Sequence, residues 1–540
     1  MALSSTHRIK HGFVRRVPSL HHEHASYKWW VLLNVMIGTF MAVLDATIVN
    51  VALPKIMASF GIDVDKAEWI LTGYLLVFAV MLPTSGWVAD HLGYKRTYFM
   101  ALFLFTLGSF LCGLAWDENA LIIFRIVQAM GAGFLMPVGM AIVTREFPPQ
   151  QRGIALGFWS IAAAASVSLG PLIGGYLVDN IGWNAIFDVN VPVGMVGLFA
   201  TVVIQREFKT ESTRSFDVIG FVSSAVFLIS LLLALSDGNA SWNTGGWTSP
   251  FILSCFFISG IALIVFLVTE LSVEHPLIEL RLLKNFNFGV TNGILFIFGL
   301  GMFGSTFLLP LYLQNSLGYT ALQAGAVFLP VGILQAITAP IAGFLSDKVN
   351  PKIPSAIGLF LLALSLFMNS FLSLYSEHYQ IMLPLYVRGF AMGMVFSPLS
   401  TLALSEIPRH KIAQASGLFN VLRQLGGSFG VALMGALLTR RVIYHTATYG
   451  QMIDSYSPAF RKVVSQLTYF SRYAIGGTDA ISAMRAKSLI AAHIVQQSFV
   501  RAINDDFLVA AGITLLSVIP IFLLRVHKKK SPGPSAAPME

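Results

Sequence analysis

Four ionisable residues stand inside long apolar stretches of this chain: Asp45, Arg125, Arg388 and Arg423. An ionisable side chain in hydrocarbon costs at least ~2.5–3.5 kcal/mol on insertion scales, so such residues usually mark ion or substrate pathways. Burial favours the protonated form of a carboxyl group, whereas a nearby guanidinium favours its charged form. A buried acid beside an arginine could therefore bind or release a proton according to the distance between them.

The acid among these four residues is Asp45. It lies past the middle of its apolar run, in the motif Leu44-Asp-Ala-Thr-Ile-Val-Asn-Val-Ala-Leu-Pro54. Arg125 opens Arg125-Ile-Val-Gln-Ala-Met-Gly131 at a similar expected depth, so we predict that the two couple to protons. Candidate cavity residues near them are Thr47, Asn50 and Gln128. The alternatives are a structural acid that caps or pairs with a neighbouring helix, and an arginine that reaches the outer interface.

Crossing ~30 Å of hydrocarbon takes about 20 apolar residues in a helix, and the chain has about fourteen such runs. The predicted spans are 29–53, 67–89, 97–116, 120–144, 153–178, 186–205, 216–236, 250–271, 287–312, 321–346, 353–376, 379–405, 412–439 and 506–526. With 55% hydrophobic and 11% charged residues, the chain is an integral membrane protein. No large soluble domain fits in what remains.

An even number of spans puts both termini on one side, and the basic residues predict which side that is. One set of connections holds nearly all the lysines and arginines, while the other short loops hold only Lys55 and Lys66. The positive-inside rule then places both termini in the cytoplasm. The long outer segment 440–505 also carries basic residues but is too long for the rule, and its stretch 480–500 favours an amphipathic helix.

The charge and cysteine patterns exclude other classes. The net charge of +9 is spread over short loops, so nucleic acid is not an expected partner. Cys112 and Cys255 both fall in spans, which argues against a disulfide framework. Segment 1–28 lacks the features of a cleavable signal. Its histidine-rich stretch 21–24 is expected to be a solvated segment rather than a metal site.

Three short motifs recur at a nearly constant offset, which indicates two homologous halves. One is Gly153-Ile-Ala-Leu-Gly157-Phe158, matched by Gln414-Ala-Ser-Gly417-Leu-Phe419. Gly86-Trp-Val-Ala-Asp90 is repeated as Gly343-Phe-Leu-Ser-Asp347, and Arg388-Gly-Phe-Ala-Met-Gly393 is the counterpart of the Arg125 motif. Parallel repeats are the architecture of major facilitator transporters. The spans 216–236 and 250–271 have no counterpart and are predicted to be an inserted pair.

The first copy continues as Gly86-Trp-Val-Ala-Asp-His-Leu-Gly-Tyr-Lys-Arg96 and is a poor substrate site. We predict that it forms a gate at the cytoplasmic side, which must open during transport. The residues assigned to this gate are Gly86, Asp90, Gly93, Lys95, Arg96 and Arg145. The basic pair could also simply obey the positive-inside rule.

Two glycine-rich stretches stand out, and the first of them predicts a close helix contact. Gly170-Pro171-Leu-Ile-Gly174-Gly175 lies in the fifth span, and Arg423-Gln424-Leu-Gly-Gly-Ser-Phe-Gly430 lies in the thirteenth. Arg423, Gln424 and Arg388 are further cavity candidates. Asp188, near the outer end of the sixth span, has no assigned role.

These motifs together resemble the major facilitator superfamily, and specifically the fourteen-span drug:proton antiporters of the EmrB type, over residues 29–440. The resemblance implies an all-α membrane protein with the major facilitator fold, made of two six-helix bundles plus two inserted helices. The implied organisation is 1–28 cytoplasmic, 29–205 first bundle, 206–286 inserted linker, 287–439 and 506–526 second bundle, 440–505 outer loop and 527–540 cytoplasmic tail. Gly170–Gly175 resembles the family's antiporter motif.

The expected function is export of amphipathic drugs or toxic compounds across a bacterial inner membrane, driven by protons and without a cofactor. Partners expected besides the bilayer and small substrates are a periplasmic adaptor and an outer-membrane channel, by resemblance alone. A dedicated exporter of one metabolite, antibiotic or siderophore is the alternative on the same fold. A receptor that has lost transport, or a membrane enzyme, fits less well, since the motifs are intact and no phosphate loop or nucleophile elbow is present.

Overall fold

The computed structural model describes residues 26–62, 64–209, 216–238, 240, 242–274, 276–348, 350–408, 411–454, 456–476 and 478–525. Throughout these ranges the regular secondary structure is helical. Thirteen helices there are long and apolar enough to cross a membrane, or 14 with the bent segments Pro149–Val167 and Leu172–Asn180 counted as one span. This confirms an all-α membrane protein. The histidine-rich stretch 21–24 and the tail 527–540 lie outside the described residues.

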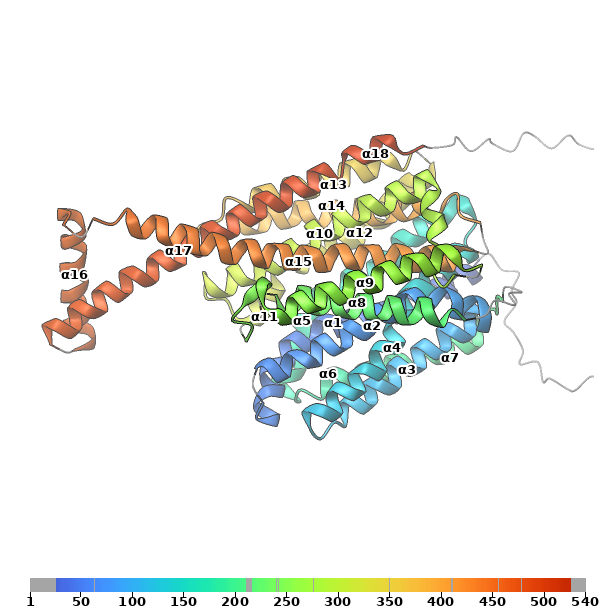
Figure 1. The fold of residues 1–540 in the computed structure, drawn as a ribbon, viewed down its shortest axis with the longest axis horizontal. Helices are drawn as coiled ribbons and strands as arrows, with labels where there is room; N and C mark the ends of the chain where they lie inside the picture. The colour runs from blue at the N-terminus through green and yellow to red at the C-terminus, as the bar shows by residue number, and fades with distance from the viewer. Residues whose placement is uncertain are drawn as a thin grey trace, which may run out of the picture.

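The first bundle follows the predicted spans closely. Its helices are α1 Tyr27–Phe60, α2 Val64–Leu92, α3 Tyr94–Gly113, α4 Glu118–Glu146, α5 Arg152–Asn180, α6 Ala185–Asp188 and α7 Asn190–Ile204, with a 3-10 turn η1 Pro149–Gln151. Asp117 caps α4 by accepting from the Ala120 amide at 2.7 Å, which satisfies one of the open N–H groups at the start of the helix. The bundle lies along one side of the molecule (Figure 1).

The inserted pair packs against the seam between the two bundles. It consists of α8 Val218–Asp237 and α9 Pro250–Ser272, with η2 Gly246–Thr248 between them. Leu231 and Leu235 of α8 bury themselves against Ala432 of the second bundle. The second half then begins after η3 Leu280–Lys284.

The second half contains α10 Phe286–Asn315, α11 Ala321–Ala326, α12 Leu329–Lys348, α13 Lys352–Asn369, α14 His378–Leu404, α15 Ile412–Gln451, α16 Pro458–Ile475, α17 Asp479–Leu516 and α18 Ile519–Leu523. Among the boundaries inside the bundle, the end of α13 differs clearly, since the helix ends at Asn369 rather than at 376. The Ser370 hydroxyl at this end donates to the Phe367 carbonyl at 2.7 Å. Such local hydrogen bonds offer the backbone an alternative to the helix.

Segment 440–505 is built as helix rather than as a separate loop. The helix α15 continues for 40 residues to Gln451, and α17 already begins at Asp479. Neither 440–449 nor 480–505 contains a glycine or proline that would end a helix early. Figure 1 shows α15 and α17 leaving the bundle together, with α16 lying across their ends. We call this part, residues 440–505, the protrusion.

Candidate functional site

The centre of the first bundle holds a fully buried ion pair. Asp45 of α1 is 0% exposed and Arg125 of α4 is 1% exposed. The Arg125 Nη1 donates to the Asp45 Oδ2. Gln128, one helical turn after Arg125, joins both partners: its Oε1 accepts from Arg125 at 2.7 Å, and its Nε2 donates to the Asp45 Oδ1 at 2.8 Å. The structure thus brings Asp45, Arg125 and Gln128 together.

Two residues that the sequence reading missed complete this network. Asn190 at the start of α7 donates to the Asp45 Oδ1 at 3.4 Å and to the Ser109 hydroxyl at 3.2 Å. Ser109 of α3 also accepts from the Gln128 Nε2 at 2.6 Å. The available signal was that each is a polar residue inside an apolar span. Side chains from α1, α3, α4 and α7 therefore form one network around the buried carboxylate, which itself accepts from α4 and α7.

The guanidinium of Arg125 is enclosed on its other sides. It lies 3.9 Å from the centre of the Tyr74 ring, and its Nε donates to the Ile70 carbonyl at 3.4 Å, both on α2. Cation–π contact and hydrogen bonding substitute for lost hydration. Close approach of α3 and α4 requires Gly108, because a Cβ there would lie 2.5 Å from the Gln128 Cα.

This arrangement makes protonation and packing interdependent. Protonation of Asp45 would remove the charge that neutralises Arg125 and would leave a buried guanidinium without a counter-ion. Removing one partner of a buried pair costs roughly 3–5 kcal/mol. A proton on Asp45 therefore disfavours this packing of α1, α3, α4 and α7 relative to any packing in which Arg125 finds another partner.

Thr47 and Asn50 do not join the Asp45 network. Thr47 donates to the Leu44 carbonyl at 2.9 Å and faces α5, where it meets Gly170. Asn50 is exposed and donates to the Ala46 carbonyl of its own helix at 3.3 Å. These two cavity candidates therefore lie apart from Asp45, because residues two and five positions along a helix point in different directions at 3.6 residues per turn.

The second half carries two arginines without a matching acid. Arg388 of α14 is 2% exposed and donates to the Thr306 hydroxyl of α10. Arg423 of α15 lies 5.9 Å from the ring centres of both Phe303 and Phe396. Neither makes an ion pair with any described residue. Gln424 lines a gap with α2 and α8, away from Asp45.

The predicted gate residues lie at what we call the basic end, where α2, α4 and α14 finish. Tyr94 donates to the Asp90 Oδ1 at 3.0 Å, and the guanidinium of Arg145 lies 4.3 Å from the Tyr94 ring centre. The Tyr94 hydroxyl also faces the backbone of Ala413 in the first turn of α15. These residues therefore lie at a contact between the halves.

The other gate residues have a local role. Gly93 adopts φ 99°, a left-handed conformation that favours glycine, and a Cβ there would strike Glu207. Glu207 accepts from the backbone amides of Lys95 at 3.1 Å and Arg96 at 3.3 Å. Burial raises the pKa of Glu207, although these contacts oppose the rise. Lys95 and Arg96 thus anchor α3 to the segment after α7 within the first half.

The second motif copy forms a direct bond between the halves. Asp347 at the end of α12 accepts from the amides of Gly153 and Ile154, both at 3.0 Å, in the first turn of α5. Negative charge at a helix N-terminus is favourable. The equivalent Gly86 approaches Gln414 at the start of α15, where an added Cβ would lie 2.8 Å from the Gln414 Cα. The second copy lacks a counterpart of Gly93 and the full basic pair, yet it makes the clearer hydrogen bonds between the halves.

Further contacts hold the halves together at the basic end. Ser397 of α14 donates to the Gly153 carbonyl at 2.6 Å, and Asn420 of α15 donates to the Met140 sulfur at 3.9 Å. Towards the middle, Trp159 of α5 packs on Phe396, with ring centres 5.7 Å apart, and Phe396 packs on Phe419. Polar contacts and an aromatic layer therefore close this end.

The glycine motif of α5 serves two different contacts. A Cβ on Gly170 or Gly174 would strike Thr47 or Ile48 of α1, within the first half. A Cβ on Gly175 would lie 3.0 Å from Leu322 of α11, in the second half. Pro171 lies within α5, and its side chain is outside the described residues. The motif thus lies where α5 touches both halves.

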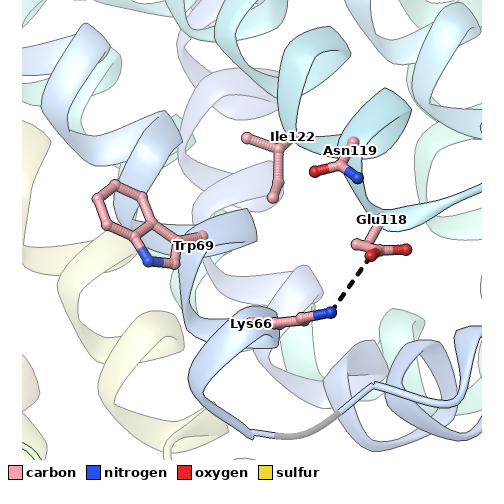
Figure 2. A pocket seen from close by; sticks show the side chains of 5 residues that line it. All are labelled: Lys66, Trp69, Glu118, Asn119 and Ile122. Atoms are coloured by element: carbon pink, nitrogen blue, oxygen red, sulfur yellow. Dashed lines mark ion pairs between the residues drawn. The ribbon is translucent and has the colours of Figure 1, made fainter.

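Other polar features lie away from this site. Asp188 is exposed at the junction of α6 and α7, beside Gly113. Figure 2 shows a pocket between the starts of α2 and α4, where Lys66 and Glu118 are 3.8 Å apart. Asp506 of α17 is 0% exposed, and the sequence reading missed it because it fell at a predicted span boundary. Within the described ranges, no cluster of three His, Cys, Asp or Glu side chains could hold a metal.

Comparison with known proteins identifies the family to which this chain belongs. The Major Facilitator Superfamily model matches residues 35–431. The chain is 32% identical to the multidrug export protein EmrB of Haemophilus influenzae, over 89% of this chain and 92% of that protein. It is 30% identical to the fatty acid resistance protein FarB of Neisseria gonorrhoeae, over 92% and 95%.

A solved structure shares the fold at low sequence identity. The human organic anion transporter MFSD10 superposes with a TM-score of 0.61 and 14% identity, over 92% of this chain and 99% of that one. The family match and the relatives therefore show that this chain is a transport protein of the major facilitator superfamily, of the EmrB multidrug transporter type.

Proposed function

We propose that this chain is a proton-driven antiporter that exports amphipathic drugs or toxic compounds across a bacterial inner membrane by alternating access. The observation that carries the proposal is the buried pair of Asp45 and Arg125, bridged by Gln128. A charged pair costs desolvation free energy wherever it is placed, and replacing such a pair by apolar residues is often neutral or stabilising. A role in proton transfer accounts for its presence.

In this proposal a proton acts by shifting a conformational equilibrium. Protonated Asp45 no longer neutralises Arg125, so the packing of α1, α3, α4 and α7 around them loses stability. A ligand can move a two-state equilibrium only through its different affinity for the two states, and the proton does so here. Release of the proton to the other side restores the ion pair and resets the transporter.

The contacts between the halves supply the element that must switch. With both termini in the cytoplasm, as the basic loops favour, the basic end is the cytoplasmic end. The described conformation is then closed towards the cytoplasm by Asp347 on the start of α5, by Gly86 on α15 and by the layer of Trp159 and Phe396. Substrate entry requires these contacts to part.

The names of the relatives support export of several drugs and also leave room for export of one class of compound. Haemophilus EmrB is named as a multidrug export protein, whereas the gonococcal relative is named for fatty acid resistance. A dedicated exporter of one metabolite, antibiotic or siderophore therefore stays the second candidate. The two differ in how many unrelated compounds the protein protects against.

The protrusion supports a protein partner, for which we propose a periplasmic adaptor leading to an outer-membrane channel. With 40 residues at 1.5 Å each, α15 is about 60 Å long, roughly twice the ~30 Å of hydrocarbon. Its outer part and α16 therefore stand clear of the bilayer. Tyr469, Phe470 and Tyr473 of α16 are more than 60% exposed there. Exposed aromatic residues that cannot reach lipid suit a protein contact.

A susceptibility panel tests the proposed function. Cells that lack the gene would carry the wild-type chain, Asp45→Asn or an empty vector, with membrane abundance matched by immunoblot. Wild type is expected to raise tolerance to several unrelated amphipathic compounds, and Asp45→Asn to none. Protection against a single compound would favour the dedicated exporter, and equal protection by Asp45→Asn would contradict proton coupling at this residue.

A further inference from the structure

The second half has an unbalanced positive charge in its membrane region. Between residues 286 and 450 the acidic residues are Asp347, Glu377 and Glu406. Each lies at a helix end and is engaged: Asp347 on α5, Glu377 in the capping box of α14, and Glu406 as acceptor from Asn285 and Asn287. Beyond residue 450 this half adds Asp454, Asp479, Asp505 and Asp506. Asp479 pairs with Arg472, Asp505 pairs with Arg441 and His445, and Asp506 lies beside Asp505. None of the acids described in this half forms an ion pair with Arg388 or Arg423.

The arrangement around Arg388 leaves part of its guanidinium unused. Its Nη2 donates to the Thr306 hydroxyl and to the Met302 carbonyl at 3.3 Å, both on α10. Its Nε and Nη1 are buried without a hydrogen-bond partner. The hydrogen bonds hold the side chain in place, but its positive charge is not compensated.

Arg423 of α15 also lies beside α10, close to where Arg388 contacts that helix, and it faces the other half. Its guanidinium lies near Phe303 of α10 and near Phe396, and Phe396 in turn packs on Trp159 of the first half. The side chain is only partly buried, and its Nε is buried without a hydrogen-bond partner. A cation set among aromatic rings at the junction of the halves is thus open to an anionic partner.

We propose that Arg423 binds the carboxylate of an anionic amphipathic substrate, with Arg388 adding positive potential behind it. This inference rests on the proposed export function and names its substrate class. A guanidinium pairs strongly with a carboxylate where water is excluded. Phe303 and Phe396, which are only partly buried, offer apolar surface for the body of the molecule. The first half contributes no competing field, because Asp45 and Arg125 neutralise one another.

A charge-matched pair of probes tests this site directly. The full chain in lipid nanodiscs would be titrated by fluorescence with 11-(dansylamino)undecanoic acid and with its methyl ester, which differ in the carboxylate alone. We expect wild type to bind the acid more tightly than the ester. We expect Arg423→Gln to weaken binding of the acid about tenfold or more and to leave the ester unchanged.

Two variants make the result specific. Arg423→Lys keeps the charge and the fold and is expected to bind the acid with intermediate affinity, because lysine lacks the planar fork of the guanidinium. Arg441→Gln removes a more exposed arginine from the same helix, one paired with Asp505 at 3.3 Å, and is expected to behave as wild type. Equal binding of acid and ester by wild type, or equal loss of both in Arg423→Gln, would overturn the proposal.

Transport of the same probes separates this inference from the proposed function. Binding of the acid that depends on Arg423, without any transport driven by a pH gradient in proteoliposomes, would uphold the site and contradict the export function. Transport driven by a pH gradient that is equally fast for the acid in wild type and Arg423→Gln would uphold export and overturn the site.

Discussion

At the residue scale, the surroundings of Asp45 stabilise its charged form far better than its neutral form. The two oxygens of Asp45 accept from Arg125, Gln128 and Asn190, so the charged form is well satisfied. The neutral form loses the attraction to Arg125 yet remains in the same apolar surroundings. In the proposed mechanism this cost destabilises the described conformation, and the proton would thereby drive the conformational change.

We predict that Asp45→Asn lowers the thermal stability of the purified protein, because Arg125 then stays buried without a counter-ion at a cost of roughly 3–5 kcal/mol. The double variant Asp45→Asn with Arg125→Gln should recover much of that loss while remaining inactive in transport. Melting curves of the wild type, both single variants and the double variant form a complete cycle. Additive effects of the two substitutions would show that the pair is not coupled.

At the element scale, α5 is the helix on which both halves meet. Its first turn receives Asp347, and its second turn touches α12 through Gly157, where a Cβ would lie 2.5 Å from the Ala339 carbonyl oxygen. The neighbouring atoms are backbone, so they cannot rotate away. Glycine at this position allows the halves to close against each other.

We expect Gly157→Ala to destabilise the conformation closed at the basic end by about 1–3 kcal/mol, the usual cost of overpacking. That shifts the two-state equilibrium by roughly fivefold or more, since 1.4 kcal/mol is a factor of ten. Transport at matched abundance should fall accordingly. Gly260→Ala in α9 is the control, because a Cβ there has no neighbour within 4 Å. Equal transport by both variants would mean that α5 and α12 need not close.

At the scale of the whole molecule, each half makes the same kind of contact with the other. At the end of α2, Gly86 faces the start of α15, as does Tyr94, the hydrogen-bond partner of Asp90. The counterparts Gly343 and Asp347 at the end of α12 face the start of α5. The inserted pair α8 and α9 covers one seam between the halves. The protrusion extends from the end of the molecule opposite the basic end and gives the molecule its elongated outline in Figure 1.

A labelling experiment tests the predicted orientation of the protrusion. Ser465 of α16 is exposed, whereas Cys112 and Cys255 are both buried. Ser465→Cys in a background without the two native cysteines should react with a membrane-impermeant thiol reagent in intact spheroplasts. The same background without the new cysteine is the control. Reaction only after the membrane is opened would place both termini outside and remove the argument for a periplasmic adaptor.

Much of the fold followed from the length of the apolar runs, because a bilayer requires long apolar helices. The pairing of Asp45 with Arg125 was expected from their similar depth. Asn190 and Ser109 could not be assigned, because their contact depends on how α3 and α7 rotate about their axes. The length of α15 was missed for a related reason, since a polar helix beyond the membrane leaves no hydropathy signal.

The central claim, that a proton on Asp45 drives export, is tested most directly by transport in proteoliposomes of the purified chain. An imposed pH gradient should drive an amphipathic fluorescent substrate against its own concentration gradient, and an ionophore that collapses the pH gradient should stop it. Asp45→Asn should abolish the driven flux while leaving substrate binding in place. Uphill transport by Asp45→Asn at the wild-type rate, or wild-type transport that ignores the pH gradient, would contradict the account.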